Sequence, residues 1–269
     1  MTRLAVIGAG VMGEALVSGL VKAGWAPTDI TAADRREFRR TEMHQAHGVN
    51  VVAGNADAAR GADTVVLVVK PQDVSDVLPE IAPVLGPGAL VVSLCAGITT
   101  AQLEEHLPAG TPVVRVMPNT PALVGEGMAA LSAGSHASED DLGHATELMS
   151  ALGKAITVPE RYQDAVTAIS GSGPAYLFFV VEAMIDAGVM LGLPRDVSTL
   201  LVVQTMYGSA HLLRESGTHP TVLREQVTSP GGTTAAALRQ LEDHRVKAAF
   251  ITAMEAARDR SRALAGPAT

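Results

Sequence analysis

The sequence is poor in cysteine, lysine and aromatic residues. Its single cysteine, Cys95, excludes an intrachain disulfide and a paired-cysteine metal motif, and it is typical of a reducing compartment. Aromatic residues make up 3% of the chain, so the core must come from the aliphatic side chains within an apolar share of 47%. Lysine occurs at only four positions: Lys22, Lys70, Lys154 and Lys247. A lysine-dependent mechanism therefore has very few candidate residues.

The chain has fewer basic residues than acidic ones, 20 against 28. The formal net charge of −8 argues against electrostatic binding to nucleic acid or to an anionic membrane. The first residues, MTRLAVIGAG, lack the basic region and long apolar stretch of a secretory signal. The uncharged run Ile81–Leu103 is interrupted by prolines and glycines, so it predicts a helix end, a turn and a buried strand rather than a membrane span. We expect a cytoplasmic protein with no nucleic-acid or membrane partner.

Residues 1–160 alternate short apolar runs with helical segments. The runs are rich in Val, Ile and Leu and nearly unbroken, as in a parallel sheet covered by helices on both faces. This alternation predicts an α/β domain, a Rossmann-type doubly wound sheet that fills residues 1–160. The expected strands are Arg3–Ile7, Asp29–Asp34, Asp63–Val69, Ala89–Leu94, Thr111–Met117, Gly127–Leu131 and Ala155–Val158.

Residues 161–269 carry long helical periodicities and no strand pattern, which predicts an all-α domain. Segments such as Ala175–Val181 and Leu200–Val203 are apolar nearly all round, more than one small domain easily buries. A monomeric bundle fits this pattern less well than helices interdigitated between two subunits, so we expect a dimerisation domain. The expected helices are Pro174–Leu191, Pro194–Glu215, His219–Val227, Thr233–Leu241 and Val246–Leu264.

A glycine-rich turn follows the first expected strand and reads Gly8-Ala9-Gly10-Val11-Met12-Gly13. In this setting Gly8 makes the tight turn, Gly10 lets the backbone approach a pyrophosphate, and Gly13 allows close helix–strand packing. The helix that follows offers unpaired N–H groups to the phosphates. A chain rich in glycine and alanine produces this pattern by chance too, but its position at the first strand–helix turn favours dinucleotide binding.

Two signals at the end of the second expected strand conflict. Asp34 stands about 20 residues after the glycine motif, where an acidic side chain binds the ribose hydroxyls of NAD. Arg35 and Arg36 follow at once and suit the 2′-phosphate of NADP. An exposed helix start with ordinary charges explains the same residues without a ligand. We expect NADP(H) to be preferred and NAD(H) to be accepted.

Ligands of open α/β sheets bind beyond the carboxyl ends of the strands. Three further segments stand at such ends, and we expect them to line the cofactor cleft. Lys70 suits this cleft, and it suits a surface ion pair equally well. The segments are Val68-Val69-Lys70-Pro71, Cys95-Ala96-Gly97 and Met117-Pro118-Asn119-Thr120-Pro121.

The helical half contains two loops of small residues, Ser170–Ala175 and Thr228–Thr234, each ahead of an expected helix. Both offer backbone N–H groups and hydroxyls, which are the groups that hold a small carboxylate. Either loop also serves as an ordinary helix cap. The Gly231-Gly232 pair, with hydroxyls on both sides, is more than a cap needs.

With these segments the chain resembles pyrroline-5-carboxylate reductase, the enzyme family that makes proline, from Arg3 to Leu264. The Ser170–Ala175 loop and the segments at Lys70-Pro71 and Met117–Pro121 follow the family's order. The most specific match has the family's spacing at Pro220, Leu223, Val227-Thr228-Ser229, Gly231-Gly232, Thr234, Ala237-Leu238, Leu241 and Glu242.

The resemblance implies hydride transfer from a nicotinamide to the C=N carbon of Δ1-pyrroline-5-carboxylate, which gives L-proline. It implies that Thr234 is the catalytic residue, and that Gln226 contacts the substrate from a position where some relatives have Asn. It also implies a homodimer that assembles into a larger ring of dimers. The implied substrate-binding residues are Gln226, Ser229, Gly231, Gly232, Thr233 and Thr234. The implied cofactor-binding residues are Gly8–Gly13, Asp34–Arg36, Asn55, Val68–Pro71 and Cys95–Gly97, although relatives carry small hydroxylated residues at Asp34–Arg36.

Imine reduction agrees with the residues present. A protonated iminium is itself the electrophile, so positioning supplies most of the catalysis and the Thr234 hydroxyl acts as hydrogen-bond partner or proton relay. We expect Cys95 to be a packing residue, and we expect no metal site because the eight histidines show no ligand spacing.

Two alternatives remain open from the sequence. A β-hydroxyacid dehydrogenase also joins a Rossmann domain to a helical one, but it uses a lysine early in the helical domain, and no lysine lies between Lys154 and Lys247. A non-catalytic NADP-binding sensor would keep the Gly8–Gly13 turn and would have no use for the Ser229–Thr234 loop.

Overall fold

The computed structural model describes residues 2–265. They form two compact units. The first unit runs to Ser172 and takes in the end of the chain from Ala257, and the second unit is Gly173–Ala256. The returning segment is anchored inside the first unit, where the Ser261 hydroxyl donates a 2.7 Å hydrogen bond to Asp164. The helical unit is therefore an insertion within the first unit.

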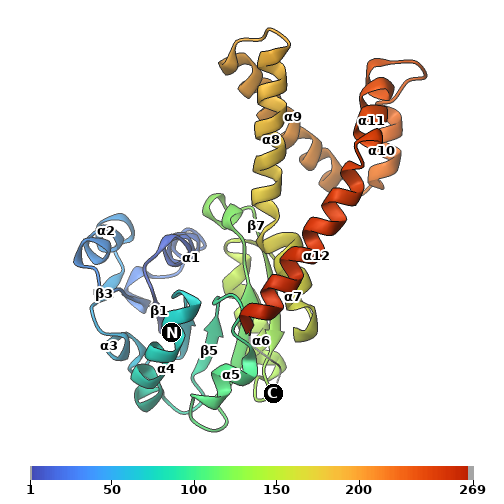
Figure 1. Cartoon of the computed structure of the whole chain (residues 1–269). Helices are drawn as coiled ribbons and strands as arrows, with labels where there is room; N and C mark the ends of the chain where they lie inside the picture. The colour runs from blue at the N-terminus through green and yellow to red at the C-terminus, as the bar shows by residue number, and fades with distance from the viewer. Residues whose placement is uncertain (1, 266–269) are drawn as a thin grey trace. The chain divides into compact units, whose positions relative to one another are not determined.

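The first unit is built on an eight-stranded sheet with the strand order β3-β2-β1-β4-β5-β6-β7-β8 (Figure 1). Strands β1 to β6 are parallel, β7 runs antiparallel to β6, and β8 is parallel to β7. This order confirms the doubly wound arrangement. The strands are β1 (Leu4–Ile7), β2 (Ile30–Ala33), β3 (Asn50–Val52), β4 (Thr64–Leu67), β5 (Leu90–Ser93), β6 (Val113–Met117), β7 (Gly127–Ala133) and β8 (Gly153–Thr157).

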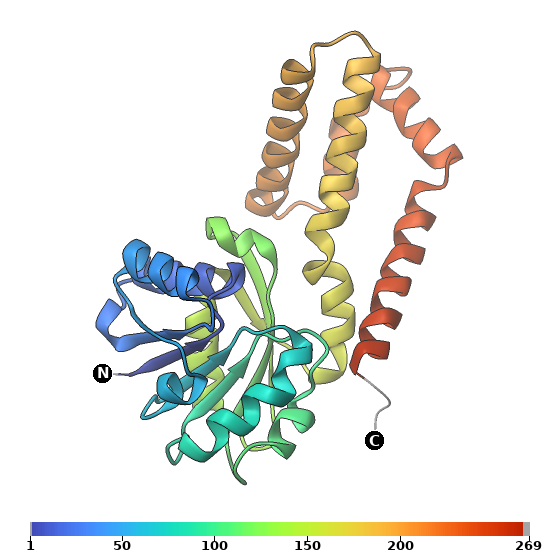
Figure 2. The same cartoon turned by 60° about the vertical axis from the view of Figure 1, so that its left-hand side comes forward.

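Helices cover both faces of the sheet because successive strand residues point to opposite sides (Figures 1 and 2). Leu4 and Val6 belong to one buried cluster, and Ala5 and Ile7 belong to the other. Helices α1 (Val11–Lys22), α2 (Glu37–His47) and α6 (Glu139–Ser150) contribute to the first cluster. Helices α3 (Asn55–Ala59), α4 (Val74–Ile81) and α5 (Thr100–Glu105) contribute to the second.

Strand β3 and helix α3 were not predicted from the sequence. Both are short, and β3 lies at the edge of the sheet with Asn50 exposed, so neither carries the long apolar run that identifies the central strands. Short helical turns complete the first unit. They are η1 (Pro27–Asp29), η2 (Pro71–Asp73), η3 (Ala82–Val84), η4 (Thr120–Val124), η5 (Glu160–Tyr162), α7 (Gln163–Val166) and the π-helical turn η6 (Thr167–Gly171).

The second unit is helical, as predicted. Its helices are α8 (Gly173–Met190), α9 (Arg195–Ser216), α10 (Pro220–Gln226), α11 (Thr233–Asp243) and α12 (Val246–Ala265), which ends in the first unit. Helices α8 and α9 lie side by side (Figures 1 and 2). A Cβ on Gly188 would collide with Ser198, whose hydroxyl donates to the Ile185 carbonyl at 2.9 Å. A small residue and a short hydroxyl therefore allow these two helices to approach closely.

Much of the apolar surface of the helical unit is exposed. Phe178, Phe179 and Leu200 have 66%, 73% and 71% of their surface accessible. Within residues 2–265, the helical stretch Glu160–Met190 is long and apolar enough to cross a membrane, judged by length and composition alone. Only 11% of its apolar part is buried. These helices carry a face that the unit itself does not cover, which agrees with the excess of apolar residues in the sequence.

A buried ion pair joins three elements of the first unit. Arg115 on β6 is 5% exposed, and its Nη1 lies 3.1 Å from Oε1 of Glu160. Glu160 also accepts hydrogen bonds from the Thr100 N–H (2.8 Å) and hydroxyl (2.6 Å). One carboxylate thus holds the start of α5 and neutralises a charge that the sheet buries.

Replacing this carboxylate should destabilise the protein strongly. We expect Glu160→Ala to lower the free energy of unfolding by about 3 kcal/mol, because Arg115 is left as an uncompensated buried charge. Glu104→Ala is a matched control, since Glu104 accepts from the Ser135 N–H and hydroxyl in the same pattern but faces no buried arginine. We expect about 1 kcal/mol for the control. Denaturant unfolding at one protein concentration measures both, and equal losses would contradict the prediction.

Candidate cofactor and substrate sites

The turn between β1 and α1 needs two of its glycines for steric reasons. Gly8 has φ 110°, which an L side chain rarely adopts, and a Cβ there would lie 2.7 Å from the Val68 carbonyl oxygen. Its N–H donates to the Ala33 carbonyl at 2.9 Å, which joins the turn to β2. A Cβ on Gly13 would collide with the Gly8 carbonyl oxygen. The turn can therefore pass this close to α1 and β4 only with glycine at both positions.

Helix α1 begins without a side-chain cap. Its N-cap is Gly10, whereas α5 and α6 begin with capping boxes at Thr99 and Ser138. A Cβ added at Gly10 would meet no atom within 4 Å. Backbone N–H groups at the start of α1 are thus accessible from above the turn, and an uncapped helix N-terminus attracts an anion. These residues fit the pyrophosphate of a dinucleotide.

Asp34 and Arg36 form an ion pair beside this turn. Arg36 Nε and Nη2 lie 2.9 Å from the two carboxylate oxygens of Asp34. Asp34 also accepts the N–H groups of Ala9 (3.1 Å) and Arg36 (2.9 Å). Burial would raise the pKa of the Asp34 carboxyl, but the hydrogen bonds from Arg36 and Ala9 outweigh burial and hold that pKa below its ordinary value. Among the described residues, no ion pair is formed by the exposed side chain of Arg35.

Strands β4 and β5 bring further predicted residues to the same edge. Val68 packs against Gly8, and the Cys95 thiol donates to the Val69 carbonyl at 3.4 Å. Cys95 is 2% exposed, and burial raises the pKa of its thiol, so it has the properties of the expected packing residue. Ala96 and Gly97 follow directly, and Gly97 has φ 77°.

The remaining predicted residues of the first unit are Lys70, Pro71, Asn55 and Asn119. Lys70 and Pro71 are exposed, and residues 2–265 offer no ion-pair partner to Lys70. Asn55 begins α3, and its amide donates to Glu80 at 2.8 Å. Asn119 links two segments, because its Nδ2 donates to the Ser170 carbonyl (3.1 Å) and its Oδ1 accepts the Met128 N–H (2.8 Å).

Arg39 contacts the glycine turn and was not among the site residues predicted from the sequence. Its Nε donates to the Ala9 carbonyl at 2.9 Å, and its Nη2 lies 2.7 Å from Glu14. The signal was present in the spacing Arg36, Arg39 and Arg40, which brings arginines to one side of α2. That spacing does not reveal that this side of the helix faces the turn, which depends on how the sheet is wound.

In the second unit the predicted substrate residues lie in the turn before α11, in the first turn of α11 and at the end of α10. Gly231 has φ 68°, and Gly232, with no side-chain cap, is the N-cap of α11. The Gly232 N–H donates to the Ser229 carbonyl at 3.0 Å, which closes the turn. Thr233 is exposed, and the half-buried Thr234 hydroxyl has no hydrogen-bond partner among the described residues. Gln226 is the last residue of α10 and is exposed. The backbone N–H groups at the start of α11 suit a carboxylate.

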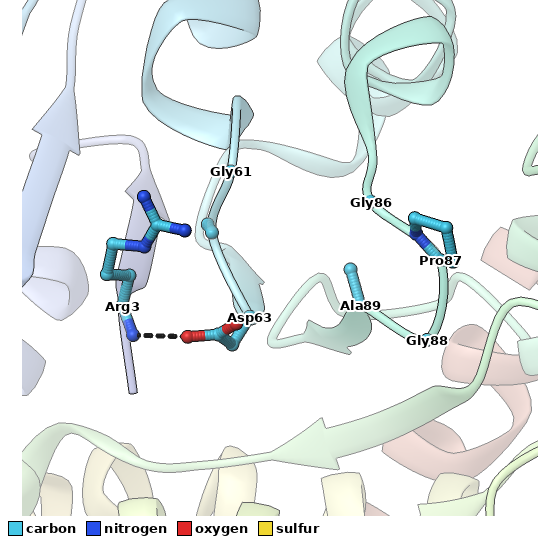
Figure 3. A pocket seen from close by; sticks show the side chains of 8 residues that line it. Arg3, Gly61, Asp63, Gly86, Pro87, Gly88 and Ala89 are labelled. Atoms are coloured by element: carbon cyan, nitrogen blue, oxygen red, sulfur yellow. Dashed lines mark hydrogen bonds between the residues drawn. The ribbon is translucent and has the colours of Figure 1, made fainter. Parts of the chain in front are cut away.

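A cavity of about 200 Å³ lies elsewhere in the first unit (Figure 3). It is lined by Arg3, Asp63 and Ala89, which precede β1, β4 and β5, and by the glycines of two turns. The backbone N–H of Arg3 donates to Asp63 at 2.7 Å, and the guanidinium points away from this bond (Figure 3). The cavity is at the amino edge of the sheet and contains no predicted site residue.

Comparison with known proteins gives the family. A family model described as pyrroline-5-carboxylate reductase dimerisation matches residues 160–264, and one described as NADP oxidoreductase, coenzyme F420-dependent, matches residues 3–97. The pyrroline-5-carboxylate reductase of Corynebacterium melassecola is 46% identical and is covered over 99% of its length by 98% of this chain. The chain belongs to the pyrroline-5-carboxylate reductase family.

Solved pyrroline-5-carboxylate reductases have the same fold. The structure from Coxiella burnetii matches with a TM-score of 0.93 at 36% identity, over 99% of both chains. A pyrroline carboxylate reductase from Plasmodium falciparum, with NADP bound, matches with a TM-score of 0.89 at 34% identity, over 98% of both chains. The family resemblance read from the sequence is confirmed.

The family match also accounts for the exposed helices. The pyrroline-5-carboxylate reductase dimerisation model covers α8 to α12, so these helices form a dimerisation domain. The apolar face of α8, which includes Phe178 and Phe179, is therefore explained by association between subunits.

Proposed function

We propose that the protein reduces Δ1-pyrroline-5-carboxylate to L-proline, the last step of proline biosynthesis, with NADPH as the reductant. The observation that carries this proposal is the 46% identity to a reductase of that name over 98% of the chain, which includes both the glycine turn and the Ser229–Thr234 loop. NADPH supplies a hydride, which adds to the C=N carbon. The ring nitrogen carries a proton and becomes the amine of proline, and NADP⁺ is released.

The first unit would hold the cofactor at the carboxyl edge of its sheet. The N–H groups at the start of α1 bind the pyrophosphate, and Gly10 permits the close approach. Val68 to Pro71 and Cys95 to Gly97 follow the neighbouring strands and border the nucleotide. Asn55 would contact it from the start of α3, once its amide leaves Glu80.

The turn before α11 would orient the substrate. The N–H groups of Thr233 and Thr234 lie at an uncapped helix start, where they bind the substrate carboxylate, and the Gly232 N–H would join them once it leaves the Ser229 carbonyl. Ser229 and Gly231 give the turn its shape, and Gln226 borders it from α10. The Thr234 hydroxyl would accept a hydrogen bond from the ring N–H or relay a proton to the ring nitrogen. Orientation of a charged iminium, rather than a strong acid, then provides the catalysis.

We further propose that NADP(H) is preferred and NAD(H) accepted. The two oxygens of Asp34 already accept from the Ala9 N–H and from Arg36, which leaves this carboxylate less free to bind ribose hydroxyls. Arg35, whose exposed side chain forms no ion pair among the described residues, supplies positive charge at the same place, where a 2′-phosphate would bind. Arg36 would donate to this phosphate from Nη1, which Asp34 does not engage.

The larger organisation of the protein is proposed on the same basis. Residues 1–160 serve the cofactor, and residues 161–269 serve substrate binding and dimerisation, with dimers assembling into a ring. A cytoplasmic location follows from the single cysteine and from a biosynthetic reaction that uses NADPH.

The proposed reaction is tested with purified full-length protein. We expect NADPH absorbance to fall when pyrroline-5-carboxylate is added, and to stay constant with simple hydroxy acids or aldehydes. The absence of turnover with both NADPH and NADH would contradict the proposal. Binding of NADPH without turnover would favour a sensor, and oxidation of hydroxy acids with NADP⁺ would favour a β-hydroxyacid dehydrogenase.

Thr234→Ala should lower kcat by about a hundredfold, because the group that positions the imine proton is lost. The Kd for NADPH should not change, and Thr234→Ser should retain most of the activity. Thr233→Ala is a matched control, since the exposed Thr233 contributes only a backbone N–H, which alanine keeps. Steady-state kinetics and cofactor titration measure these effects. An unchanged kcat in Thr234→Ala would remove this hydroxyl from the mechanism.

Arg35→Ala and Arg36→Ala should change the choice of cofactor. We expect each to raise the KM for NADPH about tenfold, because one charge-assisted contact to the 2′-phosphate is lost. Arg35→Ala should leave the KM for NADH nearly unchanged, and Arg36→Ala should lower it, because Asp34 is then free to bind the ribose hydroxyls. Arg60→Ala is the control, since the exposed Arg60 lies at the opposite end of α3 from Asn55. Equal effects on both cofactors would show that these arginines do not bind the 2′-phosphate.

A further inference from the structure

The peptide groups around Ala9 are held from two sides. The Ala9 N–H donates to Asp34 at 3.1 Å, and the Ala9 carbonyl accepts from Arg39 Nε at 2.9 Å. Ala9 is the residue between Gly8 and Gly10, so its orientation decides where the first N–H groups of α1 point. Two charged side chains, one directly after β2 and one on α2, therefore hold the middle of the glycine turn.

Each of the three guanidinium nitrogens of Arg39 makes a contact in this arrangement. Nη2 lies 2.7 Å from Glu14 in the first turn of α1, and Nη1 lies 2.6 Å from Glu42 on its own helix. Its side chain is only 17% exposed. The guanidinium thus connects α2 to the carbonyl of the turn and to the helix that follows the turn.

Glu14 places a negative charge near the proposed pyrophosphate site. Its carboxylate stands in the first turn of α1, close to the helix end that would bind the pyrophosphate. The hydrogen bond and charge of Arg39 hold the pKa of Glu14 below its ordinary value against the opposing effect of burial. Without Arg39, Glu14 would keep only His47, whose Nε2 lies 3.6 Å from Oε1, and its carboxylate would repel the phosphates more strongly.

We infer that Arg39 is a positioning residue for the dinucleotide: it prearranges the glycine turn and neutralises Glu14 without touching the cofactor. The inference rests on the proposed function for the identity of the ligand. A turn that is already ordered binds more tightly, since less conformational freedom is lost on binding. Because Arg39 acts through Ala9 and Glu14, it affects the part of the site that NADP and NAD share.

The test is the Kd of the full-length protein for NADP⁺ and for NAD⁺, measured by calorimetric titration and independent of turnover. We expect Arg39→Ala to raise both Kd values by the same factor, roughly tenfold, the worth of one charge-assisted hydrogen bond. The kcat at saturating cofactor should not change. Arg39→Lys should give an intermediate effect, because it keeps the charge but cannot reach Ala9 and Glu14 together.

Glu42→Gln is the matched control, because it removes one partner of Arg39 and leaves the contacts to Ala9 and Glu14 in place. Its Kd values should equal those of the wild type. If Arg39→Ala does not fold, Arg39→Lys carries the test, and it should weaken both cofactors by the same factor.

The outcomes separate this inference from the proposed function. A wild-type protein that binds neither cofactor would overturn the proposed function. A wild-type protein that binds, with unchanged Kd values and a lower Tm in Arg39→Ala, would show a merely structural arginine and overturn the inference. A change in the ratio of the two Kd values would show that Arg39 contacts the 2′-phosphate, and would also overturn it.

Discussion

The close passage of the first turn between α1, β2 and β4 is the constraint on which the first unit depends. Gly8 must adopt a positive φ against Val68, and Gly13 must leave room for the Gly8 carbonyl. This close packing directs the start of α1 toward the carboxyl edge of the sheet, where the ends of β4 and β5 also lie. The same backbone geometry therefore sets the helix–sheet packing and opens an anion site, so folding and binding share one set of atoms.

The parts of the fold that sequence alone predicts are those set by local pattern. Central strands such as β4 and β5 are unbroken apolar runs, and the helices of the second unit have long periodicities and clear ends. Strand β3 could not be read, because it is short and lies at the edge, where burial imposes little pattern. The glycine turn was readable because its backbone conformation restricts the residue type directly.

Charged side chains were harder to predict, because their partners are distant in the sequence. Asp34 and Arg36 were read as competing signals for two cofactors, and the structure pairs them with each other. Arg39 meets Glu14 from a helix that follows a different strand, so only the winding of the sheet brings them together. Residue type indicates which charges a site holds, whereas the tertiary fold decides which of them are already neutralised.

The return of α12 to the first unit has a consequence for how the chain is made. Ser261 donates a hydrogen bond to Asp164, and the inserted unit lies between these two residues in the sequence. The first unit therefore contains residues that the ribosome adds after the inserted unit. The sheet and its glycine turn can form early during translation. The packing around Asp164 waits for α12, by which time the apolar helices of the insertion are already outside the ribosome. Completion of the first unit therefore comes only after the inserted helices have been made.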